Sequence, residues 1–142
     1  MFRKLRNTYG GNVRNTPDEV IREILALEEA QKTLSIREKA QDNFMVFVKH
    51  VYEGFIEGLH HKEVAKQYEK LSGNPGSRVI INMPPRHTKS EFASYLLPAW
   101  LIGKNPKLKI IQTTHTAELA VRFGRKVRNL MDTAEYKEIF PD

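Results

Sequence analysis

Lys89 and Ser90 are the residues whose types and spacing give this chain its clearest chemistry. They follow an apolar run and a short proline-containing loop in the sequence VIINMPPRHTKSEF, residues 79–92. A Lys-Ser pair that opens a helix after a strand and a loop ends the phosphate-binding pattern G-x-x-x-x-G-K-[ST]. In that pattern the lysine reaches the β- and γ-phosphates and the hydroxyl ligates Mg²⁺. Met83 and Thr88 replace the two glycines. The residues alone are therefore compatible with two interpretations, a nucleotide site without its glycines and a simple proline turn.

The replaced glycines affect the loop unequally. Pro84 and Pro85 have no N–H to offer a phosphate, so the start of the loop has fewer donors. Thr88 stands where glycine permits a positive φ, and a β-branched residue in that conformation costs about 1–3 kcal/mol. We therefore expect Thr88 either to adopt another conformation or to be held in place by its surroundings.

Other residues with chemical potential have weaker patterns. His60 and His61 are adjacent in the sequence, and the side chains of adjacent residues on a helix should point apart. The pair also lacks the spacing of metal ligands, so it is interpreted as a surface pair. Thr114 and His115 lie at the end of the second predicted strand, a position where α/β proteins place ligands. The alternative is that they only begin a loop and cap the next helix. Trp100 is predicted to lie in the core.

The charge is uneven along the 142 residues, which carry a net charge of +6. Residues 1–14 hold four basic and no acidic side chains, and residues 104–130 hold seven basic side chains against one glutamate. Such zones indicate contact with a polyanion or a solvated face. The chain has no cysteine, which excludes a disulfide scaffold, and no apolar stretch long enough to span a bilayer. We expect a soluble protein of the cell interior.

Residues 1–15 are predicted to form a flexible basic arm and residues 16–76 a helical region. Thr16-Pro17-Asp18-Glu19 is typical of a helix start, with a capping residue, proline at the first helical position and a closing glutamate. Ser35 and Glu38 repeat this capping pattern and predict that a second helix begins there. A third helix is predicted over residues 60–71.

The pattern changes to alternating strands and helices after residue 77. Residues 78–83 are mostly apolar and rich in β-branched residues, which predicts a strand, and residues 108–115 are predicted to form a second strand after a turn. Helices are predicted from Lys89, with Pro98 kinking or ending the first, and over residues 117–131 after a Thr116 cap. A strand-helix-strand-helix order predicts an α/β fold with a parallel βαβ unit over residues 77–142.

Residues 44–142 resemble the N-terminal ATPase portion of the large subunit of tailed-phage terminases. The resemblance rests on the segments below, which occur in the order and spacing of that family. They are FVKHVYEGFIEGLHHKEVAKQYEKL, RVIINMPPRHTKSEFASYLLPAWLIGKNP, KIIQTTHTAELAVRFGRKVRNLM and EYKEIFPD. The form Met-Pro-Pro-Arg-His-x-Lys-Ser-Glu is a distinctive version of the family's nucleotide loop.

The resemblance implies a P-loop motor that hydrolyses ATP with Mg²⁺ to drive double-stranded DNA into a capsid. The implied binding loop comprises Pro85, Arg86, His87, Thr88, Lys89 and Ser90. Within it, Lys89 would bind phosphate, Ser90 would ligate Mg²⁺, and Arg86 would sense or stabilise the γ-phosphate, unless it only braces the loop through a salt bridge. The segment around His60 and His61 corresponds to the part of the family's sequence that lies near the adenine.

The implied partners are the terminase small subunit, the capsid portal and, for the full-length protein, further copies of itself in the host cytoplasm. DNA contacts are expected from Arg122, Arg125 and Arg128. A P-loop ATPase also needs a strand ending in acidic residues to hold Mg²⁺ and activate water, yet the run KIIQTTH ends in Thr and His. We therefore expect a fragment with an incomplete ATPase core. The alternative is a nucleic-acid- or partner-binding module whose loop no longer binds nucleotide.

Overall fold

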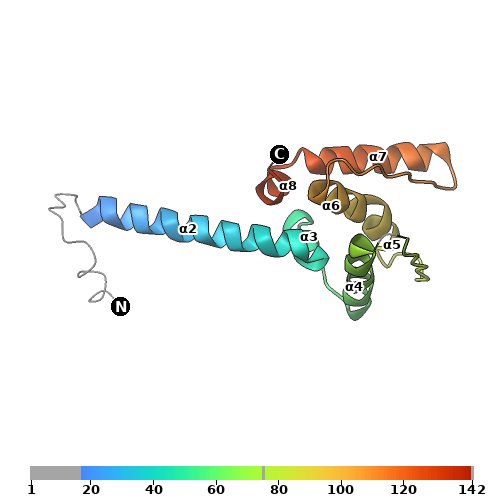
Figure 1. Cartoon of the computed structure of the whole chain (residues 1–142), viewed down its shortest axis with the longest axis horizontal. Helices are drawn as coiled ribbons and strands as arrows, with labels where there is room; N and C mark the ends of the chain where they lie inside the picture. The colour runs from blue at the N-terminus through green and yellow to red at the C-terminus, as the bar shows by residue number, and fades with distance from the viewer. Residues whose placement is uncertain (1–16, 75, 142) are drawn as a thin grey trace. The chain divides into compact units, whose positions relative to one another are not determined.

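The computed structural model describes residues 17–74 and 76–141, and the predicted basic arm and the Thr16 cap lie outside them. The chain divides into the units Met1–Lys32 and Thr33–Asp142. The elements are α2 (Pro17–Asp42), α3 (Phe44–Val51), α4 (Leu59–Gly73), α5 (Lys89–Glu91), the π-helix η1 (Phe92–Leu96), α6 (Leu97–Lys104), α7 (Ala117–Met131) and α8 (Ala134–Ile139) (Figure 1). No helix within this described part has the length and apolar content to cross a bilayer.

The predicted α/β fold is wrong, because residues 17–74 and 76–141 form no strand. The parallel βαβ unit is therefore absent from the described structure. Residues 78–83 and 108–115 have no regular structure and no backbone hydrogen bond joins them. Ile80 and Ile111 remain 87% and 90% exposed. The apolar, β-branched pattern predicts a strand, but it cannot supply the neighbouring strands that a sheet needs, and a lone strand pair is only marginally stable.

Helix α2 begins at Pro17, the predicted first helical position. The described residues of the first unit lie in this helix, where every side chain from Asp18 to Lys32 is exposed. The second helix predicted at Ser35 does not begin there, because α2 continues to Asp42. Residues 33–42 contain neither glycine nor proline, so the local capping pattern is overridden by an uninterrupted run of helix-compatible residues.

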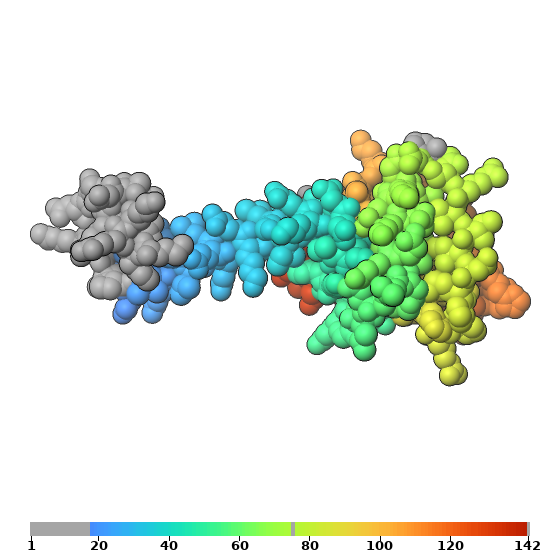
Figure 2. Space-filling model, turned by 90° about the horizontal axis from the view of Figure 1, so that it is seen from below, coloured from blue at the N-terminus to red at the C-terminus, as the bar shows by residue number. Residues whose placement is uncertain are grey.

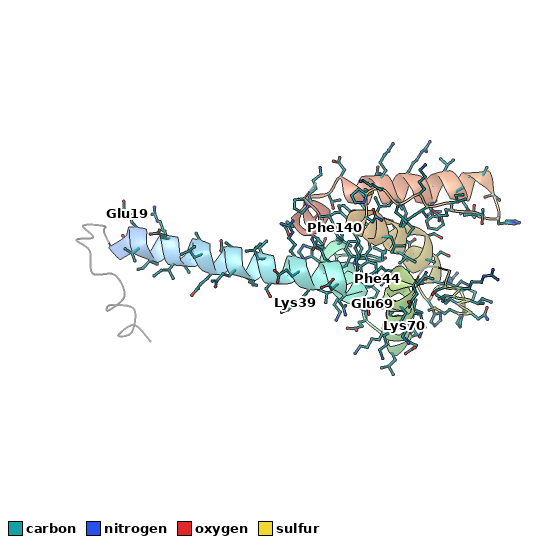
Figure 3. All side chains as sticks on the ribbon, in the orientation of Figure 1. Glu19, Lys39, Phe44, Glu69, Lys70 and Phe140 are labelled. Carbon is teal, nitrogen blue, oxygen red and sulfur yellow. The ribbon has the colours of Figure 1, made fainter. Side chains whose placement is uncertain are left out.

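The break between α2 and α3 is built from side-chain capping. The Asn43 side chain accepts a hydrogen bond of 2.9 Å from the Val46 N–H. The Phe44 N–H donates to Glu69 Oε1 of α4, also at 2.9 Å. Figure 3 labels Phe44 and Glu69 at this junction of α3 and α4. Two of the donors that a helix start leaves without an intrahelical partner are thereby satisfied.

The core of the second unit is an aromatic cluster centred on Phe44. Its ring is fully buried and makes edge contacts with Tyr68, Phe92 and Trp100, with ring centroids 5.4–5.5 Å apart. Trp100 is buried as predicted, and its Nε1–H donates to the Ala40 carbonyl at 2.9 Å. The cluster thus joins the end of α2 with α3, α4, η1 and α6.

Pro98 reshapes the helix around it rather than ending it. Because proline has no N–H, the Ser94 carbonyl four residues earlier loses its helical partner. The preceding residues Phe92–Leu96 widen into a π-helix, and the Leu97 N–H bonds to the Phe92 carbonyl. The freed Ser94 carbonyl accepts a hydrogen bond of 3.2 Å from the Gln112 side chain. This bond attaches the irregular segment before α7 to the widened turn.

Helix α7 begins where the sequence predicts. The Thr116 side chain accepts from the Leu119 N–H at 3.3 Å, and the helix ends at Met131. Its apolar residues pack inward, with Leu130 buried and Phe123 and Val127 half-buried. Figure 1 shows α7 beside α6, and the two helices are in contact.

We expect Gly103→Ala to destabilise the fold by about 1–3 kcal/mol through overpacking. A Cβ at Gly103 would lie 2.5 Å from Cδ2 and 2.6 Å from Cγ of Phe140. The Phe140 ring packs on Phe47 and Tyr136, which limits its room to move. Chemical denaturation measures the change in the free energy of unfolding.

The matched control is Gly124→Ala, also within a helix. A Cβ there meets nothing within 4 Å, so alanine should stabilise α7 by about 0.5–1 kcal/mol through its better helix propensity. Equal effects at the two positions would contradict the close packing of Phe140 on α6.

Candidate phosphate-binding loop

The loop of residues 84–88 connects an irregular segment to a continuous helical stretch. The stretch begins with α5 at Lys89, so Ser90 lies in its first turn, as the sequence predicts. The loop and its flanks line an open hollow of about 510 Å³, formed by Pro84, Pro85, Arg86, Thr88, Lys89, Ser90 and Glu91. The structure therefore brings six of the seven residues 84–90 to one surface, and His87 is the exception.

Two non-glycine residues of the loop have left-handed backbones. Thr88 has φ 57° and ψ 8°, and Arg86 has φ 64°. Thr88 thus adopts the conformation for which the phosphate-loop pattern uses glycine, at the cost in strain expected for a β-branched residue. The sequence pattern raised this question for Thr88 but gave no signal for Arg86.

Hydrogen bonds within the loop support this backbone. The Thr88 hydroxyl donates to the His87 carbonyl at 2.7 Å, and His87 Nδ1 lies 2.9 Å from the Pro85 carbonyl oxygen. The Lys89 ammonium reaches back across the loop to the Met83 carbonyl at 3.3 Å. Lys89 is exposed, and its hydrogen bond to the Met83 carbonyl is long and weak. An anionic ligand bound at the loop can therefore compete with that carbonyl for the ammonium.

Arg86 is an exposed cation on the rim of the hollow. It forms no ion pair with any described residue. The alternative role considered for Arg86, bracing the loop through a salt bridge, therefore finds no partner in this part of the chain.

His61 packs against the loop, which corrects its interpretation as half of a surface pair. It is only 7% exposed, its ring stacks on Phe92 with centroids 5.1 Å apart, and its Nε2 lies 2.5 Å from the Thr88 hydroxyl. The His60 and His61 rings do not point apart, because their Nε2 atoms are 3.0 Å from each other. Figure 2 shows α4 and the segment of the loop side by side on one face.

Burial lowers the pKa of His61, and the neighbouring His60 lowers it further. His61 is therefore favoured in its neutral form, which can donate through one ring nitrogen and accept through the other. Helical periodicity predicts side-chain directions only along one helix, whereas this contact depends on where the chain returns 27 residues later.

Glu91, next to Ser90, is bound by Lys126, one of the basic residues of α7. The Lys126 ammonium of α7 donates to both carboxylate oxygens, at 2.7 and 2.8 Å, and lies over the Tyr95 ring. This pair connects the helix that follows the candidate loop to α7. It also engages one of the four basic residues of α7, which are Arg122, Arg125, Lys126 and Arg128.

The other basic residues of α7 are exposed. An open hollow of about 630 Å³ along the helix is lined by Ala117, Glu118, Val121, Arg122, Arg125, Lys126 and Asn129. Arg128 donates through Nε and Nη2 to Asn129 Oδ1. The structure thus gathers Arg122 and Arg125 at one surface, the basic face of α7. The Arg128 guanidinium is engaged by the neighbouring Asn129 side chain.

We expect this basic face to bind double-stranded DNA weakly, without sequence specificity and with a steep dependence on salt, because phosphate contacts release counterions. Fluorescence anisotropy at two salt concentrations measures the affinity. Arg122→Ala combined with Arg125→Ala should reduce both the affinity and its salt dependence.

The control is Lys66→Ala combined with Lys70→Ala, which removes the same charge from exposed positions on α4. A similar loss of affinity in both double variants would mean that net charge, and not the α7 face, attracts the DNA.

Three His, Cys, Asp or Glu side chains do not converge on a metal-binding position anywhere in the described residues. Ser90 would supply one hydroxyl ligand to Mg²⁺, and the carboxylate beside it is held by Lys126. The chain matches no protein-family model, and no curated protein and no solved structure is significantly similar to it.

Proposed function

We propose that this chain is the ATP-binding part of a DNA-packaging motor of the terminase large-subunit type. The observation that carries the proposal is the conformation of the loop before Lys89 and Ser90. Thr88 has the left-handed backbone that the phosphate-binding pattern assigns to glycine, although its side chain makes that conformation costly. Strain of this kind persists where the surrounding structure imposes it, and such residues cluster at ligand sites.

The roles of the loop residues follow from their positions. Lys89 would exchange the Met83 carbonyl for the β- and γ-phosphates, since an ammonium binds a charged acceptor more strongly. Arg86 would meet the γ-phosphate, and the backbone of Pro85, His87 and Thr88 would border the phosphates. Ser90 would offer its hydroxyl to Mg²⁺, which neutralises phosphate charge when bound.

The partners belong to the same proposal. Double-stranded DNA would contact the basic face of α7, and the terminase small subunit, the capsid portal and further copies of the chain would assemble with the motor in the host cytoplasm. An alternative is a nucleic-acid-binding module without nucleotide, which the exposed Arg122 and Arg125 favour.

Mg²⁺–ATP binding by wild type and Lys89→Ala tests the proposal. Fluorescence of a labelled ATP analogue should show binding to wild type that unlabelled ATP displaces. We expect Lys89→Ala to weaken it at least about tenfold, because hydrogen bonds to charged groups contribute about 1.5–3 kcal/mol.

Lys109→Ala is the matched control, since it removes the same charge from another exposed position. Unchanged affinity in Lys89→Ala, or equal losses in both variants, would refute the site. Wild type that binds DNA but no nucleotide would favour the alternative module.

A further inference from the structure

A chain of hydrogen bonds runs from the start of α4 into the candidate phosphate loop. The Gly58 N–H donates to His61 Nδ1 at 2.9 Å, and His61 Nε2 lies 2.5 Å from the Thr88 hydroxyl oxygen. That hydroxyl donates to the His87 carbonyl at 2.7 Å. This chain of hydrogen bonds therefore passes through Thr88, one of the two loop residues with a left-handed backbone.

These contacts define which nitrogen of His61 carries its proton. Because Nδ1 accepts from the Gly58 N–H, it holds no proton in this arrangement. The Thr88 hydroxyl spends its one hydrogen on the His87 carbonyl, so it accepts from His61. His61 is thus neutral with its proton on Nε2, and the nearby His60 Nε2 can only accept.

His61 also has a fixed position from which to act. It occupies the third position of α4, and its Nδ1 accepts from the N–H of Gly58, the N-cap residue of that helix. Its ring packs on Phe55 and Phe92, with centroids 4.9 and 5.1 Å away. Glycine at position 58 leaves room for the neighbouring His60 ring, which would lie 2.7 Å from a Cβ there. The donor aimed at Thr88 is therefore held on three sides.

We propose that His61 is a positioning residue which, as the Nε2–H tautomer, holds Thr88 in its left-handed conformation and so fixes the phosphate loop for nucleotide. This inference rests on the proposed nucleotide site. A glycine at position 88 reaches the left-handed region without such support, whereas threonine has a hydroxyl that can be held. The histidine and the threonine together do what the glycine of the usual pattern does alone.

Protonation of His61 would end this arrangement, because a proton on Nδ1 faces the Gly58 N–H. The groups that face or act on His61 are His60 on α4, His87 and Lys89 in the loop, and Glu57 before α4. The pKa of His61 is lowered below 6.5, first by burial and then by His60. Neutral His61 therefore contributes fully to the stability of the folded chain above pH 6.5. That contribution is lost as the pH falls from 6.5 through the lower pKa that His61 has in the folded chain.

Two substitutions separate the capping role of His61 from its role at the loop. His61→Asn keeps an acceptor close to the Gly58 N–H but is too short to reach Thr88. His61→Gln has the length to place an amide N–H at the position of Nε2. We expect His61→Asn to weaken Mg²⁺–ATP binding about tenfold and His61→Gln to retain most of the affinity.

Thr88→Gly provides the decisive background. In the Thr88→Gly background, where glycine needs no held hydroxyl, we expect His61→Asn to weaken Mg²⁺–ATP binding by less than about twofold. The fall in affinity between pH 7.5 and 5.5 should also be smaller in Thr88→Gly than in wild type. An equal loss from His61→Asn in both backgrounds would show that His61 only stabilises the fold, and would overturn the proposal.

NMR of the whole chain tests the inference without nucleotide. The ¹⁵N shifts of the His61 ring should report a protonated Nε2 and an unprotonated Nδ1 above pH 7. His61→Asn should shift the backbone amides of Thr88 and Lys89, and His61→Gln should shift them less. A proton on Nδ1, or loop amides unmoved by His61→Asn, would overturn the inference. If these signals are as expected and wild type binds no ATP, the proposed function fails while the positioning contact stands.

Discussion

Phe44→Ala is expected to lower the free energy of unfolding of the second unit by about 3–5 kcal/mol. The ring is fully buried and contacts Phe47, Tyr68, Phe92 and Trp100, so its removal leaves a cavity where α3, α4, η1 and α6 meet. Surrounding aromatic rings are large and mutually packed, which limits collapse into the space. A loss of this size is a large part of the stability of an ordinary domain.

Urea denaturation followed by tryptophan fluorescence measures this loss. Trp100 is the sole tryptophan and is itself buried in the cluster, so its emission reports the packing directly. Ile56→Ala is the control, because that side chain is 86% exposed and should contribute less than about 0.5 kcal/mol. A loss below about 1 kcal/mol for Phe44→Ala would contradict the aromatic cluster as the core.

Phosphate release from ATP is expected to stay at background for this chain, with or without DNA. Hydrolysis by phosphate-loop enzymes needs a carboxylate to help hold Mg²⁺ and a residue to orient water. No apolar run of the sequence ends in paired acidic residues. Glu91, the carboxylate nearest in sequence to Ser90, is held at 2.7 and 2.8 Å by Lys126. Loss of a positioned base alone costs about 10²–10⁴-fold in rate.

A coupled phosphate-release assay compares wild type with Lys89→Ala. Their rates should be indistinguishable, although we expect the two proteins to differ in ATP binding. Lys126→Ala extends the comparison by freeing Glu91. Turnover by wild type that is clearly faster than by Lys89→Ala would mean that a carboxylate within these 142 residues acts as the base. The expectation of an incomplete ATPase core would then be wrong.

The helices and part of the core could be predicted because their causes are local. Pro17 and Thr116 predicted two helix starts, and α2 and α7 begin at those places in the structure. Trp100 could be assigned to the core from its size and type alone. Ser35 was misleading because a capping pattern states only that a helix can begin there, and α2 passes through it.

The rest depends on contacts between distant segments. Strand formation in residues 78–83 and 108–115 needs partners that no local pattern can specify, and none pairs with them in the described structure. The contact of His61 with Thr88 spans 27 residues, and that of Glu91 with Lys126 spans 35. Pro98 predicted a disturbed helix, but nothing in the sequence indicated the hydrogen bond between the Gln112 side chain and the Ser94 carbonyl, 18 residues apart.

The two irregular apolar segments have a practical consequence for handling the purified protein. Ile80 and Ile111 point largely into solvent within β-branched runs that carry no acidic side chain. Short runs of this composition are templates for intermolecular β-sheet growth. Turbidity and light scattering should therefore rise with protein concentration and storage time, and an Ile80→Lys, Ile111→Lys variant should remain clear at concentrations where wild type does not. Stocks for the binding experiments are best kept dilute and freshly prepared, since aggregates would scatter light and trap nucleotide and DNA alike.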